Sequence, residues 1–152
     1  MWALCKIISG GQTGADKTAL VVAKELGYET GGYAPRHYKT EDGSDWSLKD
    51  EFGLSEMPTE AYRPRTWRNV KESDGTVWFG TGMSPGFQCT WNAIKTCCKP
   101  YILNPDPLTL KAWLIAHNIV VLNVAGHRRS THRETEVIVR SVLEAVLKGV
   151  QG

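Results

Sequence analysis

The chain has 152 residues, which is enough for one domain with a full hydrophobic core. Apolar residues make up 41% and charged residues 22% of the chain, and this excludes a disordered or low-complexity protein. The 18 basic and 16 acidic residues leave a net charge of +2, so bulk charge predicts neither a nucleic-acid nor a membrane partner.

The N-terminal residues lead directly into an apolar run at 4–9, with no basic n-region and no small-residue cleavage site. We interpret this run as a strand, in which Cys5 is expected to be a small core residue. The other cysteines, Cys89, Cys97 and Cys98, show neither a C-x-x-C nor a zinc-finger spacing. The expectation is a cytoplasmic protein with reduced thiols.

A helix is predicted over residues 15–26, because apolar residues there share one face and Gly27 follows as a C-cap. Residues 33–58 are predicted to form a long loop with short pieces of structure, since Pro and Gly interrupt any periodicity. The aromatic residues of this loop favour a packed, ligand-facing segment; they are Tyr38, Trp46 and Phe52.

The rest of the chain alternates between apolar runs and helical patterns. Buried strands are predicted at 76–79, 101–103 and 119–124. A helical stretch carries Trp91 and Ile94, another helix starts with Asp106 as N-cap before Pro107, and a last apolar stripe covers 139–147. The alternation predicts an α/β fold of three layers, with a parallel sheet of five or more strands and helices on both faces.

A glycine-rich turn follows the first strand, Ser9-Gly10-Gly11-Gln12-Thr13-Gly14-Ala15-Asp16. Glycine lets backbone N–H groups approach an anion at a helix N-terminus, so this turn is a candidate phosphate cradle. Its spacing is that of a P-loop, but Asp16 replaces the second glycine and would repel phosphate, which argues against an NTPase. The G-x-G-x-x-G pattern of nicotinamide enzymes does not match either. The alternative is a tight turn in which Thr13 and Asp16 form a capping-box-like pair.

Two further glycine-bearing turns follow later strands, at 80–86 and 125–130. Because the carboxyl ends of parallel strands meet at one edge of a sheet, the three turns are expected to share one ligand crevice. Cations suited to phosphate come from Arg128, Arg129 and Arg133. Two questions stay open here. Arg129 either contacts the phosphate or is a solvated surface residue. Glu134 either completes a capping box with Thr131 or has a catalytic role.

No metal site is expected, because His127, His132 and Cys89 lack the tight spacing of metal ligands. No nucleophile elbow is present, so a serine hydrolase is not expected. The tryptophans are expected in the core, with room for one of them to face a ligand ring at the rim; they are Trp67, Trp78, Trp91 and Trp113.

Segments along nearly the whole chain resemble the molybdenum carrier family, whose members are also called molybdenum cofactor carrier proteins. The segments are Ile8-Ser9-Gly10-Gly11-Gln12-Thr13-Gly14-Ala15-Asp16, Gly31-Gly32-Tyr33-Ala34-Pro35, Glu41-Asp42-Gly43, Tyr62, Arg65-Thr66, Asn69-Val70, Ser73-Asp74-Gly75-Thr76 and Leu122-Asn123-Val124-Ala125-Gly126. Each segment alone is weak, but their order and spacing together are specific.

The resemblance implies a Rossmann-like, doubly wound domain over residues 1–152, related to LOG-type nucleotide-binding proteins. It implies binding of molybdenum cofactor (molybdopterin), a pterin with a terminal phosphate and a dithiolene that holds molybdenum. The N–H groups of residues 10–14 and the turn at 84–86 are expected to hold that phosphate. The candidate cofactor-binding residues are Gly10, Gly11, Thr13, Gly14, Asp16, Ser84, Gly86, Asn123, Gly126, Arg128, Ser130 and Glu134.

The implied function is storage, protection and delivery of the cofactor, with molybdenum enzymes as recipients and without a nucleic-acid or membrane partner. Relatives of this fold associate through helices beside the sheet, so a homo-oligomer is expected by analogy, with Trp113 or Val150 at the contact. One loop departs from the family, which commonly reads Leu-Ser-Gly-Gly-Thr at residues 83–87. Here Pro85 removes an N–H donor and Phe87 replaces a hydroxyl, which weakens the case for ligand binding through this loop.

LOG relatives provide an alternative function, cleavage of the N-glycosidic bond of nucleoside monophosphates by an arginine and a glutamate near the motif Pro-Gly-Gly-x-Gly-Thr-x-x-Glu. Part of that motif survives, but Ala93 stands where the glutamate should be. Loss of the carboxylate predicts weak or no hydrolase activity unless Asp16 or Glu134 replaces it. A nucleotide-sensing module is the third alternative. We expect a carrier and not an enzyme.

Replacing Arg128 tests this interpretation. Arg128→Ala is expected to weaken binding of a phosphorylated ligand by about 1.5 to 3 kcal/mol, because a guanidinium–phosphate contact is a charged hydrogen bond. Titration of the variant and of the unsubstituted protein with the same ligand measures the difference. An unchanged affinity would remove Arg128 from the site.

Overall fold

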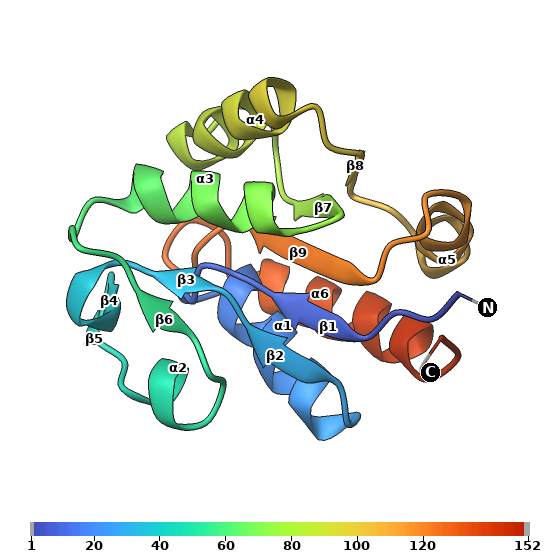
Figure 1. Cartoon of the computed structure of the whole chain (residues 1–152), viewed down its shortest axis with the longest axis horizontal. Helices are drawn as coiled ribbons and strands as arrows, with labels where there is room; N and C mark the ends of the chain where they lie inside the picture. The colour runs from blue at the N-terminus through green and yellow to red at the C-terminus, as the bar shows by residue number, and fades with distance from the viewer. Residues whose placement is uncertain (1, 151–152) are drawn as a thin grey trace.

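A computed structural model describes residues 2–150, and its centre is a parallel sheet of five strands in the order β2-β1-β9-β7-β8 (Figure 1). The strands are β1 (Lys6–Ile8), β2 (Glu29–Gly31), β7 (Gly75–Phe79), β8 (Tyr101–Leu103) and β9 (Val121–Gly126). The last strand in sequence, β9, therefore lies in the middle of the sheet, paired with β1 on one side and β7 on the other.

Helices cover both faces of this sheet. On one face lie α1 (Ala15–Glu25), α5 (Pro107–Ala116) and α6 (Glu134–Leu147), with α6 in contact with the other two. On the opposite face α3 (Tyr62–Glu72) packs against α4 (Pro85–Cys97), as the upper layer of Figure 1 shows. The predicted three-layer α/β architecture with a parallel sheet is confirmed.

The core follows from strands that are buried on both faces, as parallel strands are. Every residue of β7 is buried, and the apolar stripe of α6 packs with α1 and the sheet. The helix starts are specified locally: Asp106 Oδ1 accepts the Thr109 N–H at 2.7 Å, and Ser84 Oγ accepts the Phe87 N–H at 3.1 Å. Gly27 follows α1 with φ +84°, as a terminating glycine does.

The segment 33–58 contains only short elements, as predicted. They are β3 (Tyr33–Ala34), the 3-10 turn η1 (Arg36–Tyr38), β4 (Lys39–Thr40), β5 (Gly43–Ser44), α2 (Ser47–Asp50) and β6 (Ser55–Glu56). Its aromatic residues do not face the ligand crevice as expected. Tyr38 and Phe52 are buried in a second core with Leu20, and Trp46 is 52% exposed. The segment is therefore packed through its own core against α1.

The burial of three side chains, those of Cys5, Val150 and Trp113, differs from an expectation based on the sequence. Cys5 is exposed and not a core residue, whereas its neighbour Leu4 is fully buried. Val150 is only 6% exposed and Trp113 packs against the main core, so neither forms an exposed apolar contact surface. The helix α3 was not predicted, because basic residues dominate it and only Asn69 and Val70 are buried. Within residues 2–150, no helix combines the length and the apolar character needed to cross a membrane.

The turns after β1 and β9 touch through their backbones. A Cβ atom on Gly14 would lie 2.3 Å from the His127 carbonyl oxygen, and one on Gly126 would lie 2.4 Å from the Phe79 carbonyl oxygen. The Ala15 N–H donates to the same His127 oxygen at 3.1 Å. These two glycines thus allow the first turn of α1, the end of β7 and the end of β9 to meet in van der Waals contact.

Gly14→Ala is expected to lower the free energy of unfolding by about 2 to 5 kcal/mol, because it combines a positive φ of 83° with a backbone clash. Gly43→Ala is the matched control, since Gly43 has φ +100° and nothing within 4 Å of its Cβ position. It should cost only about 1 to 2 kcal/mol. Urea unfolding of both variants measures the difference, and equal losses would show that the close approach at Gly14 contributes nothing.

Candidate functional site

A cavity of about 550 Å³ opens at the carboxyl ends of β1, β9 and β7. It lies where α1 leaves the sheet toward one face and α4 toward the other, the position at which open α/β sheets bind ligands. Its lining comes from all three glycine-bearing turns and from α3, and includes Gln12, Asp16, Tyr62, Arg63, Arg65, Trp78, Ser84, Gly86, Gly126, His127, Arg128 and Ser130. The predicted meeting of the three turns is confirmed.

A buried ion pair joins the first turn to α3 at this cavity. Arg65 Nη1 lies 3.1 Å from Asp16 Oδ2, and the side chains are 13% and 6% exposed. Gly10 makes room for it, because a Cβ atom there would lie 1.7 Å from Arg65 Nη1. Burial raises the pKa of the Asp16 carboxyl, and the charge of Arg65 and the N–H group of Gln12 oppose that rise. The pKa of the Asp16 carboxyl is raised on balance, and Arg65 is the ion-pair partner of that carboxyl inside the protein.

Three N–H groups of the first turn, those of Gly11, Gln12 and Thr13, are used within the protein. The Gly11 N–H donates to Ser9 Oγ at 3.3 Å, and the Gln12 N–H donates to Asp16 Oδ2 at 3.2 Å. The Thr13 N–H donates to Gln12 Oε1 at 3.1 Å. This geometry does not support the expectation that these amides hold a phosphate. The proposed capping box is wrong as well, since Gly14 is the N-cap and no side chain caps α1.

Gln12 presents an unsatisfied donor. Its Oε1 accepts the N–H groups of Thr13 at 3.1 Å and of Glu41 at 2.9 Å, which fixes the orientation of the amide. Gln12 Nε2 and Arg65 Nε are buried without a hydrogen-bond partner among residues 2–150. Both residues line the cavity, and both free groups are donors. A ligand that supplies acceptors would remove the cost of leaving them unpaired.

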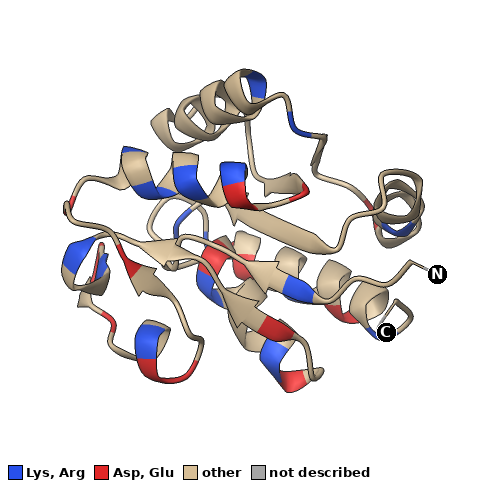
Figure 2. Cartoon of the chain, viewed as in Figure 1, with Lys and Arg blue, Asp and Glu red and all other residues tan. Residues whose placement is uncertain are grey.

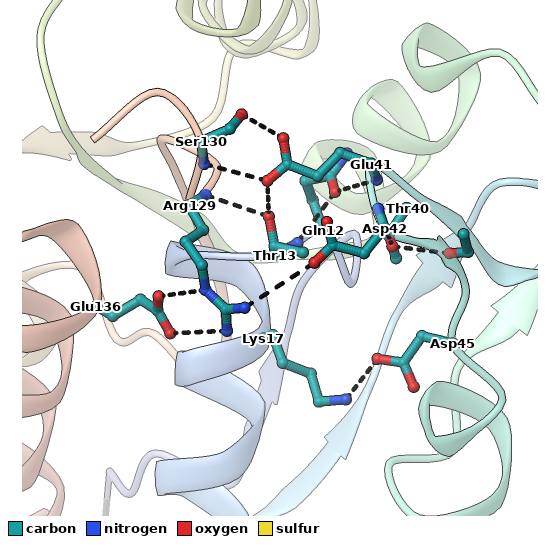
Figure 3. A network of polar contacts seen from close by, with 11 residues as sticks. Gln12, Thr13, Lys17, Thr40, Glu41, Asp42, Asp45, Arg129, Ser130 and Glu136 are labelled. Atoms are coloured by element: carbon teal, nitrogen blue, oxygen red, sulfur yellow. Dashed lines mark hydrogen bonds and ion pairs between the residues drawn. The ribbon is translucent and has the colours of Figure 1, made fainter. Parts of the chain in front are cut away.

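A hairpin formed by β4 and β5 closes over the first and third turns (Figure 3). At its tip the Glu41 carboxylate accepts hydrogen bonds from the Thr13 hydroxyl, the Ser130 hydroxyl and the Ser130 N–H, the last at 3.2 Å. Burial raises the pKa of Glu41, but these hydrogen bonds and the charge of Arg128 outweigh it, so the pKa is lowered. We call this arrangement the Glu41 clasp.

Arg129 is a surface residue, which was one of the two possibilities that the sequence left open for it. Its guanidinium holds Glu136 of α6, with Nε to Oε1 at 2.7 Å, and lies 3.9 Å from the Asp42 carboxylate (Figure 3). The side chain is 52% exposed. Arg129 therefore connects the hairpin to α6 at the surface and does not line the cavity.

His127 and Trp78 form one wall of the cavity. His127 Nε2 accepts the Thr81 N–H at 2.9 Å, and burial lowers the pKa of this histidine, so the ring is held neutral. Trp78 packs edge-on against His127 and is the tryptophan expected at the rim. His127 and His132 have ring centroids 6.0 Å apart, and within residues 2–150 no three His, Cys, Asp or Glu side chains gather as a metal site.

The loop at 83–87, whose sequence departs from the family pattern, packs around the Phe87 ring. The Phe87 ring meets Trp78 edge-on at 5.2 Å and stacks on Trp91 at 6.0 Å. Pro85 has no N–H and the Phe87 N–H is donated to Ser84 Oγ, so the start of α4 has few donors for a ligand. Ala93, where LOG enzymes carry glutamate, is buried in a core with Val70 and supplies no carboxylate.

The predicted site residues separate into three groups. Six line the cavity: Asp16, Ser84, Gly86, Gly126, Arg128 and Ser130. Two line a small recess nearby, Gly10 and Asn123. Four lie elsewhere: Gly11 packs against Leu48, Thr13 holds Glu41, Gly14 packs on His127, and Glu134 is exposed. Thr131 does not complete a capping box with Glu134, because Arg133 is the N-cap of α6.

The predicted site residues did not include Gln12, Tyr62 or Arg65, although all three line the cavity and stand in segments that carry the family resemblance. A usable signal was present in the spacing of Tyr62, Arg65 and Asn69, which places them on one face of a helix. Figure 2 shows that α3 carries several basic residues along its length.

Comparison with known proteins identifies the family. The sequence profile of the circularly permutated YpsA SLOG family (cpYpsA) matches residues 7–147. The chain belongs to this family. A crystal structure from Syntrophus aciditrophicus SB, described as "Putative molybdenum carrier protein", is 34% identical, covers 96% of each chain and superposes with a TM-score of 0.86. No curated protein sequence matches. The resemblance found from sequence segments is confirmed.

The Glu41 clasp predicts a pH-dependent stability. Because the folded pKa of Glu41 lies below the unfolded value of about 4.3, its contribution is complete above that pH and is lost as pH falls through the folded pKa. Glu41→Gln should lower the free energy of unfolding by about 1 to 2 kcal/mol at pH 7. The gap to the unsubstituted protein should shrink toward pH 3.

Urea unfolding at pH 7, 5 and 3 measures this gap. Asp42→Asn is the matched control, because Asp42 is an exposed neighbour whose distance to Arg129 is 3.9 Å. It should change stability by less than about 0.5 kcal/mol. A gap for Glu41→Gln that stays constant with pH would contradict the role given to the carboxylate.

Proposed function

We propose that this protein binds molybdenum cofactor, a phosphorylated pterin, and stores, protects and delivers it without transforming it. The name given to the similar Syntrophus structure, a putative molybdenum carrier protein, supports a molybdenum-related ligand. The cavity supports a ligand at the edge of the sheet, where open α/β sheets bind ligands. The cofactor is the cargo of this chain. The chemistry of the cavity is the independent support.

One observation carries the proposal: the buried polar atoms that stay unpartnered in the cavity lining are donors, and arginines surround them. Gln12 Nε2 and Arg65 Nε are donors without acceptors among residues 2–150. The cavity lining contains three arginines and one carboxylate, that of Asp16. A ligand rich in acceptors and negative in charge satisfies both conditions. A phosphorylated pterin has ring nitrogens, a carbonyl oxygen and a phosphate.

The cavity also offers surfaces for the flat part of such a ligand. Trp78 contributes an aromatic ring to the lining, and Ser84 and Ser130 contribute polar groups at its edge. The volume of about 550 Å³ lies in the range of ligand pockets. In this proposal Arg128 and Arg65 meet the anionic end, Gln12 meets a ring acceptor, and Gly86 leaves room for close approach.

The nucleotide functions remain the alternative, because a nucleoside monophosphate has the same combination of acceptors and phosphate. Cleavage of its N-glycosidic bond would need a carboxylate free to act. Asp16 is committed to Arg65 and to backbone N–H groups, and Glu134 is exposed on α6 outside the cavity lining. The arrangement favours binding over hydrolysis.

We place the carrier in the cytoplasm, with molybdenum enzymes as recipients, and as a homo-oligomer. All four cysteines are free thiols, which agrees with a reducing compartment. An apolar surface for association exists on α6, where Val137 is 71% and Ile138 is 47% exposed.

Retention of the cofactor tests the proposed function. Purified protein is mixed with reconstituted molybdenum cofactor, passed through gel filtration, and scored by pterin fluorescence after oxidation, with and without excess AMP. Co-elution that survives AMP is expected. Loss of the cofactor, or complete displacement by AMP, would refute the carrier function and favour the nucleotide alternatives, which release of free base from AMP then separates.

Gln12→Glu tests the unpartnered donor. The substitution keeps an acceptor for the N–H groups of Thr13 and Glu41 but replaces the free donor by a second oxygen. Cofactor retention should weaken at least about tenfold, or about 1.4 kcal/mol. Gln88→Glu is the control, because Gln88 is exposed on α4. Equal retention by the two variants would exclude Gln12 from the binding site, and thermal unfolding checks that both are folded.

A further inference from the structure

Three cations surround one aromatic ring at the edge of the cavity. Lys39 Nζ lies 5.7 Å, the Arg65 guanidinium carbon 5.4 Å and the Arg128 guanidinium carbon 5.6 Å from the centroid of the Tyr62 ring. These distances are those of cation–π contacts, which restrain where a charged head can lie. The three cations come from the β4–β5 hairpin, α3 and the turn after β9, so only the folded chain brings them together.

Two of the three cations at this ring have no ion-pair partner within residues 2–150, although the charge of Arg128 contributes to lowering the pKa of Glu41. Arg65 has Asp16 as its ion-pair partner, whereas within residues 2–150 neither Lys39 nor Arg128 has a carboxylate within 4.0 Å. Arg128 is half-buried, so less water is available to solvate its charge than at the surface. Positive charges concentrated in a concave, partly desolvated place attract an anion.

Other places for a phosphate are less suitable. The N–H groups of Gly11 to Thr13 are donated to side chains of the same turn, and α4 begins with Pro85, which has no N–H. Arg129 is engaged with Glu136. Two cations over the Tyr62 ring therefore lack an ion-pair partner within residues 2–150: Arg128, which lines the cavity, and Lys39, which is exposed beside it.

We propose that Lys39, Arg65 and Arg128, arranged around Tyr62, form the subsite for the phosphate of the ligand and favour a phosphomonoester in its dianionic form. The proposal rests on the proposed function and locates its anionic end. In the subsite Arg65 is paired with Asp16, so Lys39 and Arg128 leave two positive charges in excess, and a phosphomonoester carries close to two negative charges above its second pKa of about 6. Tyr62 orients the guanidinium groups, and the Glu41 clasp fixes the hairpin that carries Lys39.

Inorganic phosphate is the probe, because it tests the subsite without the heterocycle. Its binding is followed by ³¹P NMR titration at pH 7 and pH 5 with the unsubstituted protein, the double variant Lys39→Gln/Arg128→Gln and the control Arg68→Gln. Arg68 lies on α3, as Arg65 does, and its guanidinium carbon is 4.5 Å from the centroid of the Tyr33 ring. Unlike Lys39 and Arg128, it has an ion-pair partner, Glu72 at 3.1 Å, and it does not line the cavity.

The double variant is expected to bind phosphate at least tenfold more weakly, Arg68→Gln to bind it as the unsubstituted protein does, and binding to the unsubstituted protein to weaken at pH 5. Three results would overturn the proposal: no phosphate binding by the unsubstituted protein, an equal loss in Arg68→Gln, or no loss in the double variant. Urea unfolding confirms that the variants compared are folded.

The failure of this inference is distinguishable from the failure of the proposed function. If phosphate binds as expected but molybdenum cofactor is not retained in gel filtration, the subsite stands and the carrier function is refuted. If the cofactor is retained but the double variant retains it equally well, the carrier function stands and the phosphate lies elsewhere.

Discussion

The position of β9 in the middle of the sheet determines the candidate site. Its register pairs Asn123 with Ile8 of β1 and Gly126 with Phe79 of β7, so the turn after β9 emerges between the turns after the other two strands. Gly126 and Gly14 then let three backbones meet where side chains would separate them. Arg128 reaches the cavity because of this pairing, although it lies more than a hundred residues from the first turn.

The fold could be predicted because its determinants are local. Short apolar runs, a glycine after α1, and Asp106 before Pro107 specify strands and helix ends within a few residues. The helix α3 lacked such a signal, since its buried surface is small and its sequence is basic. Cys5 and Val150 were misjudged for a related reason: their exposure depends on neighbours that are distant in sequence, and an apolar side chain alone does not reveal them.

The site was only partly predictable, because a glycine in the sequence indicates that space is needed beside the backbone but does not identify the atoms that fill this space. The first turn was interpreted as close approach to a phosphate. In the structure Gly10 makes room for the Arg65 guanidinium and Gly14 for a carbonyl oxygen. Likewise Asp16 was interpreted as repelling an anion, whereas its charge is met by an arginine 49 residues later in the chain. Partners at such separations are specified by the fold and leave no local pattern.

The β4–β5 hairpin has consequences for the motions of the protein. It has only two residue pairs of its own, Lys39 with Ser44 and Thr40 with Gly43, and its tip is fixed by the Glu41 carboxylate. Releasing that tip breaks a few hydrogen bonds and exposes none of the sheet, so the hairpin can open as an independent unit far more often than the whole chain unfolds. Backbone amides at the tip would then exchange with solvent long before those of β7.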